Sequence, residues 1–415
     1  GDIYAEAAIT LNGGNLNNTD GIIEANTLAL QLAQITNQQS SGSGRGILSA
    51  LGNAADSLSI NTTSTLANSG IIQTNTLNAT INAQSINNTN AITHAGLGVL
   101  RITTSDALVN NAGRIVSLGS LDVQANSLAN SNAGALIAEN ELTLNAQTAI
   151  TNSASQIGAK QALNINVAAG NIVNSNTGKI ISNGGNSTIN ASGTINNQTG
   201  EIAVTGISTV SAGNQIDNRA GTIAHIGNGV LTVNATTIDN SGGNLVSQDR
   251  MLINNFNQLL NNVFNGVAGN INAPHITLNG SAINNSGGTI YAGGTNSLDV
   301  TATSLINNNG EMFSEGNVTI ATNTLSNTGG SIQSQQTLTL NLPSFNLNGG
   351  LFNAAGSLVI NTQGDLVNGT GNQLVTNGDL ALNTTGSITN WGTLSTLGNL
   401  GLSGIYLTNQ TDAVI

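Results

Sequence analysis

Six acidic residues have the spacing at which carboxyl groups could act together in catalysis. They are Glu139 with Glu141, Glu311 with Glu315, and Asp365 with Asp379. Glycosidic bond hydrolysis uses two carboxyl groups that flank the bond, and other polysaccharide chemistry uses an acid beside a basic residue. The sequence contains no Lys or Arg after Arg250, and we expect each pair to flank a turn or to lie on different strands. We therefore predict that the chain is not an enzyme; a polysaccharide-active enzyme is the remote alternative.

The other residues that could bind a metal or act as nucleophiles are too few or too scattered. Cysteine is absent, which excludes a disulfide framework and a thiol nucleophile. The three histidines, His94, His225 and His275, are far apart in the sequence and do not have the spacing of a zinc site. We expect all three histidines to be solvated at the surface, and we predict no metal and no cofactor.

Charge and composition exclude further classes of function. Only 6% of the residues are charged and the net charge is −12, whereas a nucleic-acid partner requires a basic surface that neutralises phosphates. The same charge disfavours binding to an anionic membrane surface. The sequence has no run of about 18 apolar residues that could span a bilayer, and we find no signal peptide at its start. Thr, Ser, Asn, Val, Ile and Gly dominate, which is typical of strands and tight turns.

An asparagine recurs along the chain, two residues after an apolar residue. The interval is mostly 19 to 23 residues, and the pattern is interrupted once, where Leu347 follows Phe345 at the position of the asparagine. A repeat this short cannot bury its own apolar face, so neighbouring copies must stack to form one core. The recurring asparagines are Asn18, Asn37, Asn68, Asn88, Asn110, Asn130, Asn152, Asn174, Asn197, Asn218, Asn240, Asn262, Asn285, Asn307, Asn327, Asn368, Asn390 and Asn409.

One repeat, residues 108–128, shows which elements must position these side chains. It contains a strand at 108–110, a glycine-containing corner, a second strand at 114–117, a glycine turn and a third strand at 121–123. Short strands joined by corners too short for a helix indicate one coil of a parallel β-helix. The predicted fold is all-β, a right-handed parallel β-helix of about 19–20 coils of 19–23 residues. Equivalent asparagines would then stack about 4.8 Å apart and form a ladder of side-chain amides.

Residues 1–415 are predicted to form a single β-helix. Two segments depart from the regular repeat. The spacing rises to 31 residues between Ile35 and Leu66, where we expect an inserted loop at 38–56 with a short helix. Residues 250–282 keep the spacing but are richer in bulky side chains, and we expect irregular coils there. Such departures are either tolerated insertions or a binding surface.

Three aromatic residues are candidates for a surface that binds a partner. By the repeat register, Ile290 and Met312 should point into the core. Tyr291 and Phe313 should then point outward, one above the other on adjacent coils, and Phe352 is expected to continue this column. An exposed aromatic column could stack on sugar rings or anchor a protein partner. The alternative is a self-packed stack that only strengthens the sheet.

The motif L-x-N-x-x-G-x-I is clearest at 108–115, 283–290 and 325–332, and a strand of the form L-x-V or L-T-L follows later in the repeat. It resembles the haemagglutinin repeats of filamentous haemagglutinin and of the CdiA-type exoproteins of contact-dependent growth inhibition. The resemblance covers nearly the whole chain, and it implies that residues 1–415 are an internal fragment of a longer exoprotein. It implies a two-partner-secretion exoprotein of a Gram-negative bacterium, secreted to the cell surface through an outer-membrane partner transporter.

The resemblance therefore implies a structural filament segment that extends from the cell and contacts a target cell through a surface receptor, which is a protein or a glycan. A CdiA-type rod for toxin delivery, with or without receptor-binding coils, is the first interpretation. A host-cell adhesin of the filamentous haemagglutinin type is the alternative. We expect a monomeric rod with no nucleic-acid partner.

Overall fold

The computed structural model describes residues 1–40, 45–295 and 297–415. Contacts within the chain define two units, residues 1–207 and 208–415, and each is described by itself. The described residues form strands and turns and no helix, so none of them belongs to a helix that could cross a membrane. The strands stack in parallel as a β-solenoid of about 19 turns, which confirms the predicted parallel β-helix. A single domain over 1–415 stays a prediction.

The described residues of the first unit form 22 strands. They are β1 (Ile3–Thr19), β2 (Ile22–Gln38), β3 (Ile47–Ala50), β4 (Leu58–Thr62), β5 (Thr65–Asn68), β6 (Ile71–Thr74), β7 (Ala79–Ala83), β8 (Ser85–Asn88), β9 (Ala91–His94), β10 (Val99–Thr104), β11 (Ala107–Asn111), β12 (Arg114–Ser117), β13 (Ser120–Ser131), β14 (Ala135–Ala138), β15 (Leu142–Ser153), β16 (Gln156–Ala159), β17 (Leu163–Val167), β18 (Asn171–Ser175), β19 (Lys179–Ser182), β20 (Ser187–Ala191), β21 (Thr194–Asn196) and β22 (Glu201–Thr205).

The second unit continues the numbering from β23 to β49. Its strands are β23 (Ser208–Ala212), β24 (Gln215–Asp217), β25 (Thr222–Ile226), β26 (Val230–Asn234), β27 (Thr237–Asp239), β28 (Asn244–Ser247), β29 (Arg250–Leu260), β30 (Val263–Phe264), β31 (Val267–Ala268), β32 (Asn270–Ala273), β33 (His275–Asn284), β34 (Thr289–Ala292), β35 (Leu298–Ile306), β36 (Glu311–Ser314), β37 (Val318–Ser326), β38 (Ser331–Ser334), β39 (Leu338–Leu342), β40 (Phe345–Leu347), β41 (Leu351–Ala354), β42 (Leu358–Thr362), β43 (Leu366–Asn368), β44 (Gln373–Thr376), β45 (Leu380–Thr384), β46 (Ile388–Asn390), β47 (Thr393–Thr396), β48 (Leu400–Ser403) and β49 (Leu407–Asn409).

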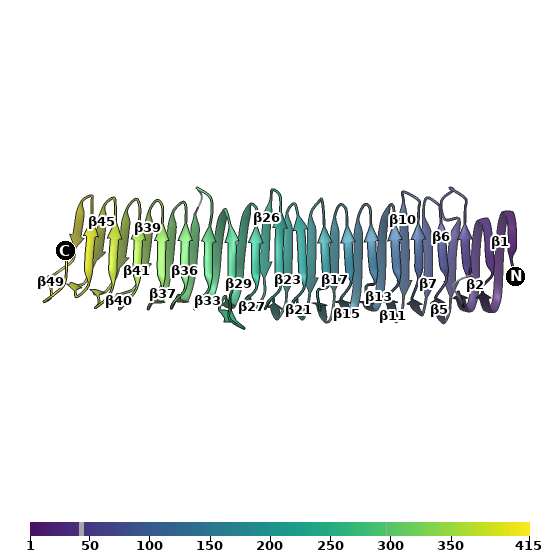
Figure 1. Ribbon diagram of the computed structural model, residues 1–415, viewed down its shortest axis with the longest axis horizontal. Coiled ribbons are helices and arrows are strands. Elements are labelled where there is room, and N and C mark those ends of the chain that lie inside the picture. Colours follow the sequence, from purple (N-terminus) through teal and green to yellow (C-terminus); the bar gives the residue numbers. More distant parts are fainter. Residues whose placement is uncertain (41–44, 296) are drawn as a thin grey trace. The chain divides into compact units, whose positions relative to one another are not determined.

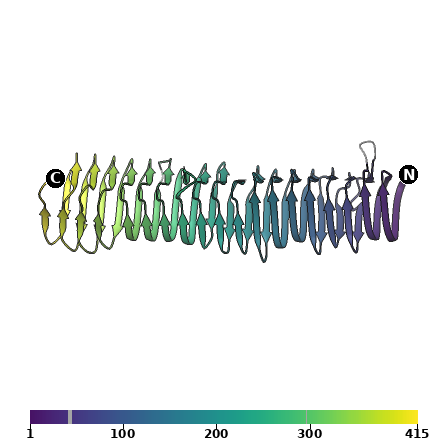
Figure 2. The ribbon, with the colours of Figure 1, turned by 60° about the horizontal axis from the view of Figure 1, so that its bottom comes forward.

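The coil that begins at β11 shows how the repeat folds. In β11, Leu108 and Asn110 align with Leu128 and Asn130 of the next coil. β12 and β13 pair in parallel with β14 and β15 in the same way, so each face of the coil continues into the next (Figures 1 and 2). Side chains alternate between the two faces of a strand, and the inward ones are apolar. Leu108, Ile115 and Val123 are fully buried, and burial of such a side chain contributes about 1.5–3 kcal/mol.

In most coils, the corner that follows the ladder asparagine contains a residue in the left-handed conformation. In several coils this residue is not glycine: Ala112 has φ 57° and Thr177 has φ 62°. A left-handed conformation costs an L-residue about 1–2 kcal/mol, so the corner needs compensating hydrogen bonds. The next residue is usually glycine because the corners stack closely; a Cβ at Gly310 would lie against the main-chain oxygen of Asn285. The N-x-x-G part of the motif is therefore a corner.

The segment 38–56 contains a strand where a short helix was expected. β3 (Ile47–Ala50) pairs in parallel with β2 and β6, and Leu48 and Ala50 are fully buried in the core. The helix prediction was wrong because coil-to-coil pairing decides the conformation of these residues. Residues 41–44 of the expected loop lie outside the described residues.

The segment 250–282 is irregular for two physical reasons. The pairing of β29 with β33 shifts between Asn254 and Phe256, and Asn255 between them has φ 58°. After β29 the chain forms an antiparallel hairpin of β30 and β31, whose turn residues Asn265 and Gly266 both have positive φ. Asn-Gly is the preferred pair for such a two-residue turn.

Candidate functional site

The asparagine ladder is the best-defined polar feature of the chain. In most steps from coil to coil, the side-chain Nδ2 of one asparagine donates to the Oδ1 of the equivalent asparagine in the next coil at 2.7–2.8 Å. The steps in the first unit join Asn18, Asn37, Asn68, Asn88, Asn110, Asn130, Asn152, Asn174 and Asn197. Those in the second unit join Asn218, Asn240, Asn261, Asn285, Asn307 and Asn327, and then Asn368, Asn390 and Asn409.

Several ladder amides also bond to the corner that follows them. Asn110 Nδ2 donates to the main-chain oxygen of Gly113 at 2.9 Å and to that of Ala135 in the next coil at 3.2 Å. Asn110 is fully buried, so these bonds form away from water, where a missing partner would be costly. The amide therefore joins neighbouring coils and stabilises the left-handed corner at Ala112. Its role is structural.

Asn262 was predicted to be a ladder residue, and this prediction was wrong. Asn261 is fully buried and occupies the ladder position, whereas Asn262 is only partly buried beside it. The register shift at Asn255 is the cause, because it aligns Leu259 with Ile283 and moves the following asparagine by one residue. Because Asn261 and Asn262 are adjacent, the sequence alone does not show which of them lies in the ladder.

Asn372 is a buried asparagine whose structural role was not predicted. Asn372 is almost fully buried, and its Oδ1 accepts a hydrogen bond from Gly350 N at 2.9 Å, while its Nδ2 donates to Leu347 O. It supports the corner of the coil in which Leu347 replaces the ladder asparagine. Asn372 lies outside the repeat motif, so the sequence did not indicate its role.

The candidate aromatic surface contains two of its three predicted residues. The rings of Tyr291 and Phe313 are stacked, with centroids 5.5 Å apart and planes inclined by 3°. Tyr291 Oη donates to Glu315 Oε1 at 2.6 Å, and this hydrogen bond raises the pKa of the Tyr291 hydroxyl. The predicted outward positions on adjacent coils are confirmed. Each ring covers one face of the other, and binding of a partner stays a prediction.

Phe352 does not belong to this column. It is fully buried, and its ring packs edge-to-face on Phe345 with centroids 5.6 Å apart. Phe352 aligns with Ile332 of the preceding coil, which is a core position. Gln333 and then Asn353 follow Phe313 in the outward column. The prediction was wrong because the coil keeps its inward register in spite of the irregular strand at Phe345.

The candidate acidic residues are held in separate structural contacts. Glu139 forms an ion pair with Lys160 at 3.0 Å, and Glu141 accepts a hydrogen bond from Asn164. Farther along the chain, Asp365 Oδ1 accepts from Ser387 N, and Asp379 Oδ1 accepts from Asn399 N, both at 2.8 Å; Glu311 is exposed. Within the described residues, no group of three or more His, Asp or Glu side chains could hold a metal ion.

Two histidines expected at the surface are buried. His94 is fully buried, with Nδ1 2.8 Å from Ser117 Oγ and Nε2 2.9 Å from Thr76 O. Burial lowers the pKa of His94. His225 is also buried and lies 3.0 Å from Ser247 Oγ. Each histidine occupies an inward position that the next coil fills with serine.

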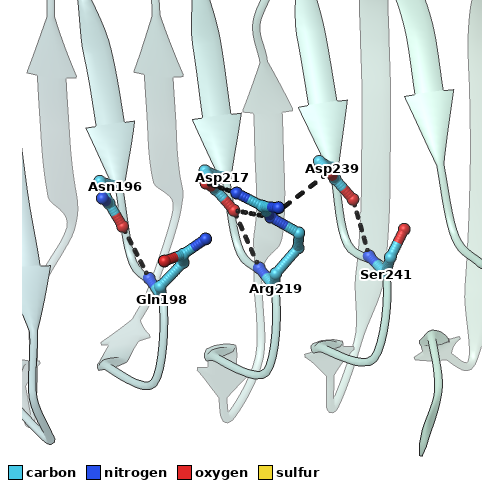
Figure 3. A network of polar contacts seen from close by, with 6 residues as sticks. All are labelled: Asn196, Gln198, Asp217, Arg219, Asp239 and Ser241. Atoms are coloured by element: carbon cyan, nitrogen blue, oxygen red, sulfur yellow. Dashed lines mark hydrogen bonds and ion pairs between the residues drawn. The ribbon is translucent and has the colours of Figure 1, made fainter. Parts of the chain in front are cut away.

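Arg219 in the second unit lies between two carboxylates. Its Nε donates to Asp217 Oδ1 at 2.9 Å and its Nη2 to Asp217 Oδ2 at 2.7 Å, and its Nε lies 3.6 Å from Asp239 Oδ2. Figure 3 shows the guanidinium between the two carboxylates. The hydrogen bond to Asp217 raises the pKa of Arg219. Its guanidinium also lies 5.4 Å from the ring centroid of Phe264 in the β30–β31 hairpin. The contact with Phe264 therefore joins the hairpin to the coil stack.

The same figure shows a turn that recurs beside the ladder. Ser241 N donates to Asp239 Oδ1 at 3.0 Å, and in the first unit Gln198 N donates to Asn196 Oδ1 at 3.0 Å (Figure 3). The acceptor in each case immediately precedes the ladder asparagine. Asn and Asp side chains favour this local bond to the backbone two residues later. These polar side chains therefore stabilise the turn at this corner.

Two hollows of the described surface lie where the L-x-V strand of successive coils ends or turns into the next strand. One, of about 480 Å³ in the second unit, is bordered by Asn341, Pro343 and Gln363, and another of the same volume in the first unit by Gln124, Asn145 and Asn166. Amide, hydroxyl and small apolar side chains line both. The carboxylates considered above do not line either hollow, so neither brings together an acid and a base.

Comparison with known proteins gives one positive result. Seven segments match the family model of the haemagglutinin repeat: residues 1–70, 116–176, 173–220, 221–263, 260–312, 294–370 and 367–415. These segments cover well over half of the chain. Searches of curated proteins and of solved structures found no significant match.

Proposed function

Because this chain belongs to the haemagglutinin repeat family, we propose that it is a structural filament segment of a large secreted surface exoprotein, which extends from the cell and mediates contact with a target cell. Proteins of this family are structural or adhesin-like and are typically secreted surface exoproteins. The observation that carries the proposal is the buried amide ladder, since it joins coil to coil by one repeated contact. Such a contact allows a filament to lengthen by adding repeats.

Within this proposal, a CdiA-type rod that delivers a toxin by contact is our first interpretation, and a host-cell adhesin is the alternative. Both use the same repeats, so the repeats do not distinguish them. Bacteria that display the full-length protein would be mixed separately with sibling bacteria and with host cells. Contact-dependent growth inhibition supports delivery, and adherence to host cells without inhibition supports the adhesin. If deletion of these coils abolishes neither growth inhibition nor adherence to host cells, both interpretations are overturned.

The proposed partner is a receptor on the target cell, either protein or glycan, and the proposed contact is the surface of Tyr291 and Phe313. The test is binding of the chain to target cells after both residues are replaced by serine. A matched control is Leu97→Ser, which alters an apolar side chain that is 78% exposed in the other unit. Reduced binding for the first variant alone supports the contact, and unchanged binding refutes it.

The remaining parts of the proposal concern export and catalysis. We propose that an outer-membrane partner transporter exports the protein, that the segment is monomeric, and that it has no catalytic function. A screen on acidic polysaccharides tests the last point. Cleavage that disappears in Asp365→Ala or Glu315→Ala would contradict it, because those carboxylates would then have a chemical role.

A further inference from the structure

Among the described residues of the second unit, one boundary between coils has an interrupted strand pairing on one of its faces. On the face that carries the ladder, β37 ends at Ser326, and the equivalent strand of the next coil is β40. Among the described strands, β40 does not pair with β37 and instead begins a separate four-stranded sheet with β43, β46 and β49. The other two faces continue across this boundary through the pairs β38–β41 and β39–β42.

The residue at the boundary explains the interruption. Leu347 aligns with Asn368 of the next coil and so occupies the ladder position. A leucine side chain offers no donor and no acceptor. Asn368 Oδ1 is consequently buried without a hydrogen-bond partner, although the Nδ2 of the same residue continues the ladder to Asn390 at 2.7 Å. On the N-terminal side of the boundary, Asn327 Nδ2 donates across it to Leu351 O at 3.2 Å.

On the ladder face, the coil that contains Leu347 is bound mainly to the coil that follows it. Asn372 bonds to both Gly350 N and Leu347 O, and Gly369 N also donates to Leu347 O at 2.9 Å. Across the boundary, the corner keeps hydrogen bonds from Gly329 N to Gly349 O at 2.8 Å and from Leu351 N to Gly330 O at 3.1 Å. The corner contacts are therefore concentrated on the C-terminal side of the coil.

In a repeat protein, stability is the sum of the stability of each repeat and of each interface with its neighbour. The interface with the fewest bonds opens at the lowest free energy. We propose that the boundary between β37 and β40 is the interface at which the coil stack of the second unit opens first, with the ladders on both sides remaining closed. If the proposed filament function holds, this boundary is where a filament pulled between two cells yields first.

Hydrogen exchange of the whole chain, followed by mass spectrometry, tests the inference without cells, so its outcome is independent of the cell-contact experiments. We expect exchange at residues 338–351 at least tenfold faster than at both flanking segments, 298–314 and 366–382. Leu347→Asn supplies the missing amide and should slow this exchange toward the flanking rate. Leu347→Ala, the matched control, shortens the side chain without supplying an amide and should leave exchange fast.

A second variant keeps the test decisive if Leu347→Asn folds poorly. Asn307→Leu places the same substitution in an intact part of the ladder and should create a new rapidly exchanging segment around residue 307. The inference is overturned if wild-type exchange rises smoothly toward residue 415, which is fraying from the end of the chain. It is also overturned if Leu347→Ala slows exchange as much as Leu347→Asn, or if Asn307→Leu leaves exchange unchanged.

Discussion

Replacement of Asn152 by alanine tests whether the buried ladder holds the coils together. Asn152 is fully buried. Its Oδ1 accepts from Asn130 Nδ2 at 2.8 Å, and its Nδ2 donates to Asn174 Oδ1 at 2.8 Å. The same Nδ2 lies within hydrogen-bond distance of Ser155 O at 3.1 Å and Lys179 O at 3.0 Å. Alanine removes all four contacts and leaves Asn174 Oδ1 without its donor.

The expected loss follows from these contacts. One hydrogen bond contributes a net ~1 kcal/mol, and a buried polar group left without a partner costs about 1–3 kcal/mol. Because the contacts share one amide, their contributions do not simply add. We expect the free energy of local opening to fall by about 3 kcal/mol, which corresponds to roughly 100-fold faster exchange because 1.4 kcal/mol is tenfold.

Hydrogen exchange at residues 142–182 is the suitable measurement, since long repeat arrays do not unfold in a single two-state step. The control is Asn190→Ala, which removes an exposed amide that donates to Asn166 Oδ1 at 2.9 Å. This change should alter local stability by less than about 0.5 kcal/mol. Equal exchange in the two variants would refute the reasoning and would mean that the apolar core alone holds the coils.

Three further changes test other parts of the structure. Phe352→Ala should lower stability by about 3–5 kcal/mol because it empties a fully buried site; denaturation that matches the wild type would contradict the core assignment. Thr177→Gly should stabilise its corner by about 1 kcal/mol, because φ is 62° there and glycine adopts this conformation without strain; slower local exchange checks it. Burial lowers the pKa of His94 below its ordinary 6.5, so its contribution to stability is present above pH 6.5 and is lost as the pH falls through the lowered pKa. Exchange at residues 91–104, corrected for intrinsic rate, should accelerate between pH 7.5 and 5, and His94→Ser should remove that acceleration.

The fold could be predicted because the same physical requirement recurs in every coil. Leu108 and Asn110 align with their equivalents in the next coil because stacked parallel strands repeat one side-chain pattern. The sequence did not reveal the shifted register at Asn255, which depends on how β29 meets β33 across two coils. For that reason Asn261 was missed although the ladder itself was predicted.

The errors at single side chains have a different origin. Phe352 lies seven residues after Phe345, an offset that points inward in other coils, but the missing ladder asparagine made this register seem disturbed. His94 was placed at the surface because buried polar groups require partners. Its partners, Ser117 Oγ and Thr76 O, come from the two neighbouring coils, and only the coil alignment brings them together.

The ladder also explains how a chain with only 6% charged residues remains ordered. Side-chain amides do not titrate, and their bonds here are buried. An ion pair such as Lys179–Glu201, at 2.9 Å, is about half exposed and contributes only about 0–1 kcal/mol. Order between coils therefore depends little on salt, and each added repeat brings its own amide and core residues. A filament outside the cell requires this combination, because its length can increase without a new kind of contact and its surface residues can vary without weakening the stack.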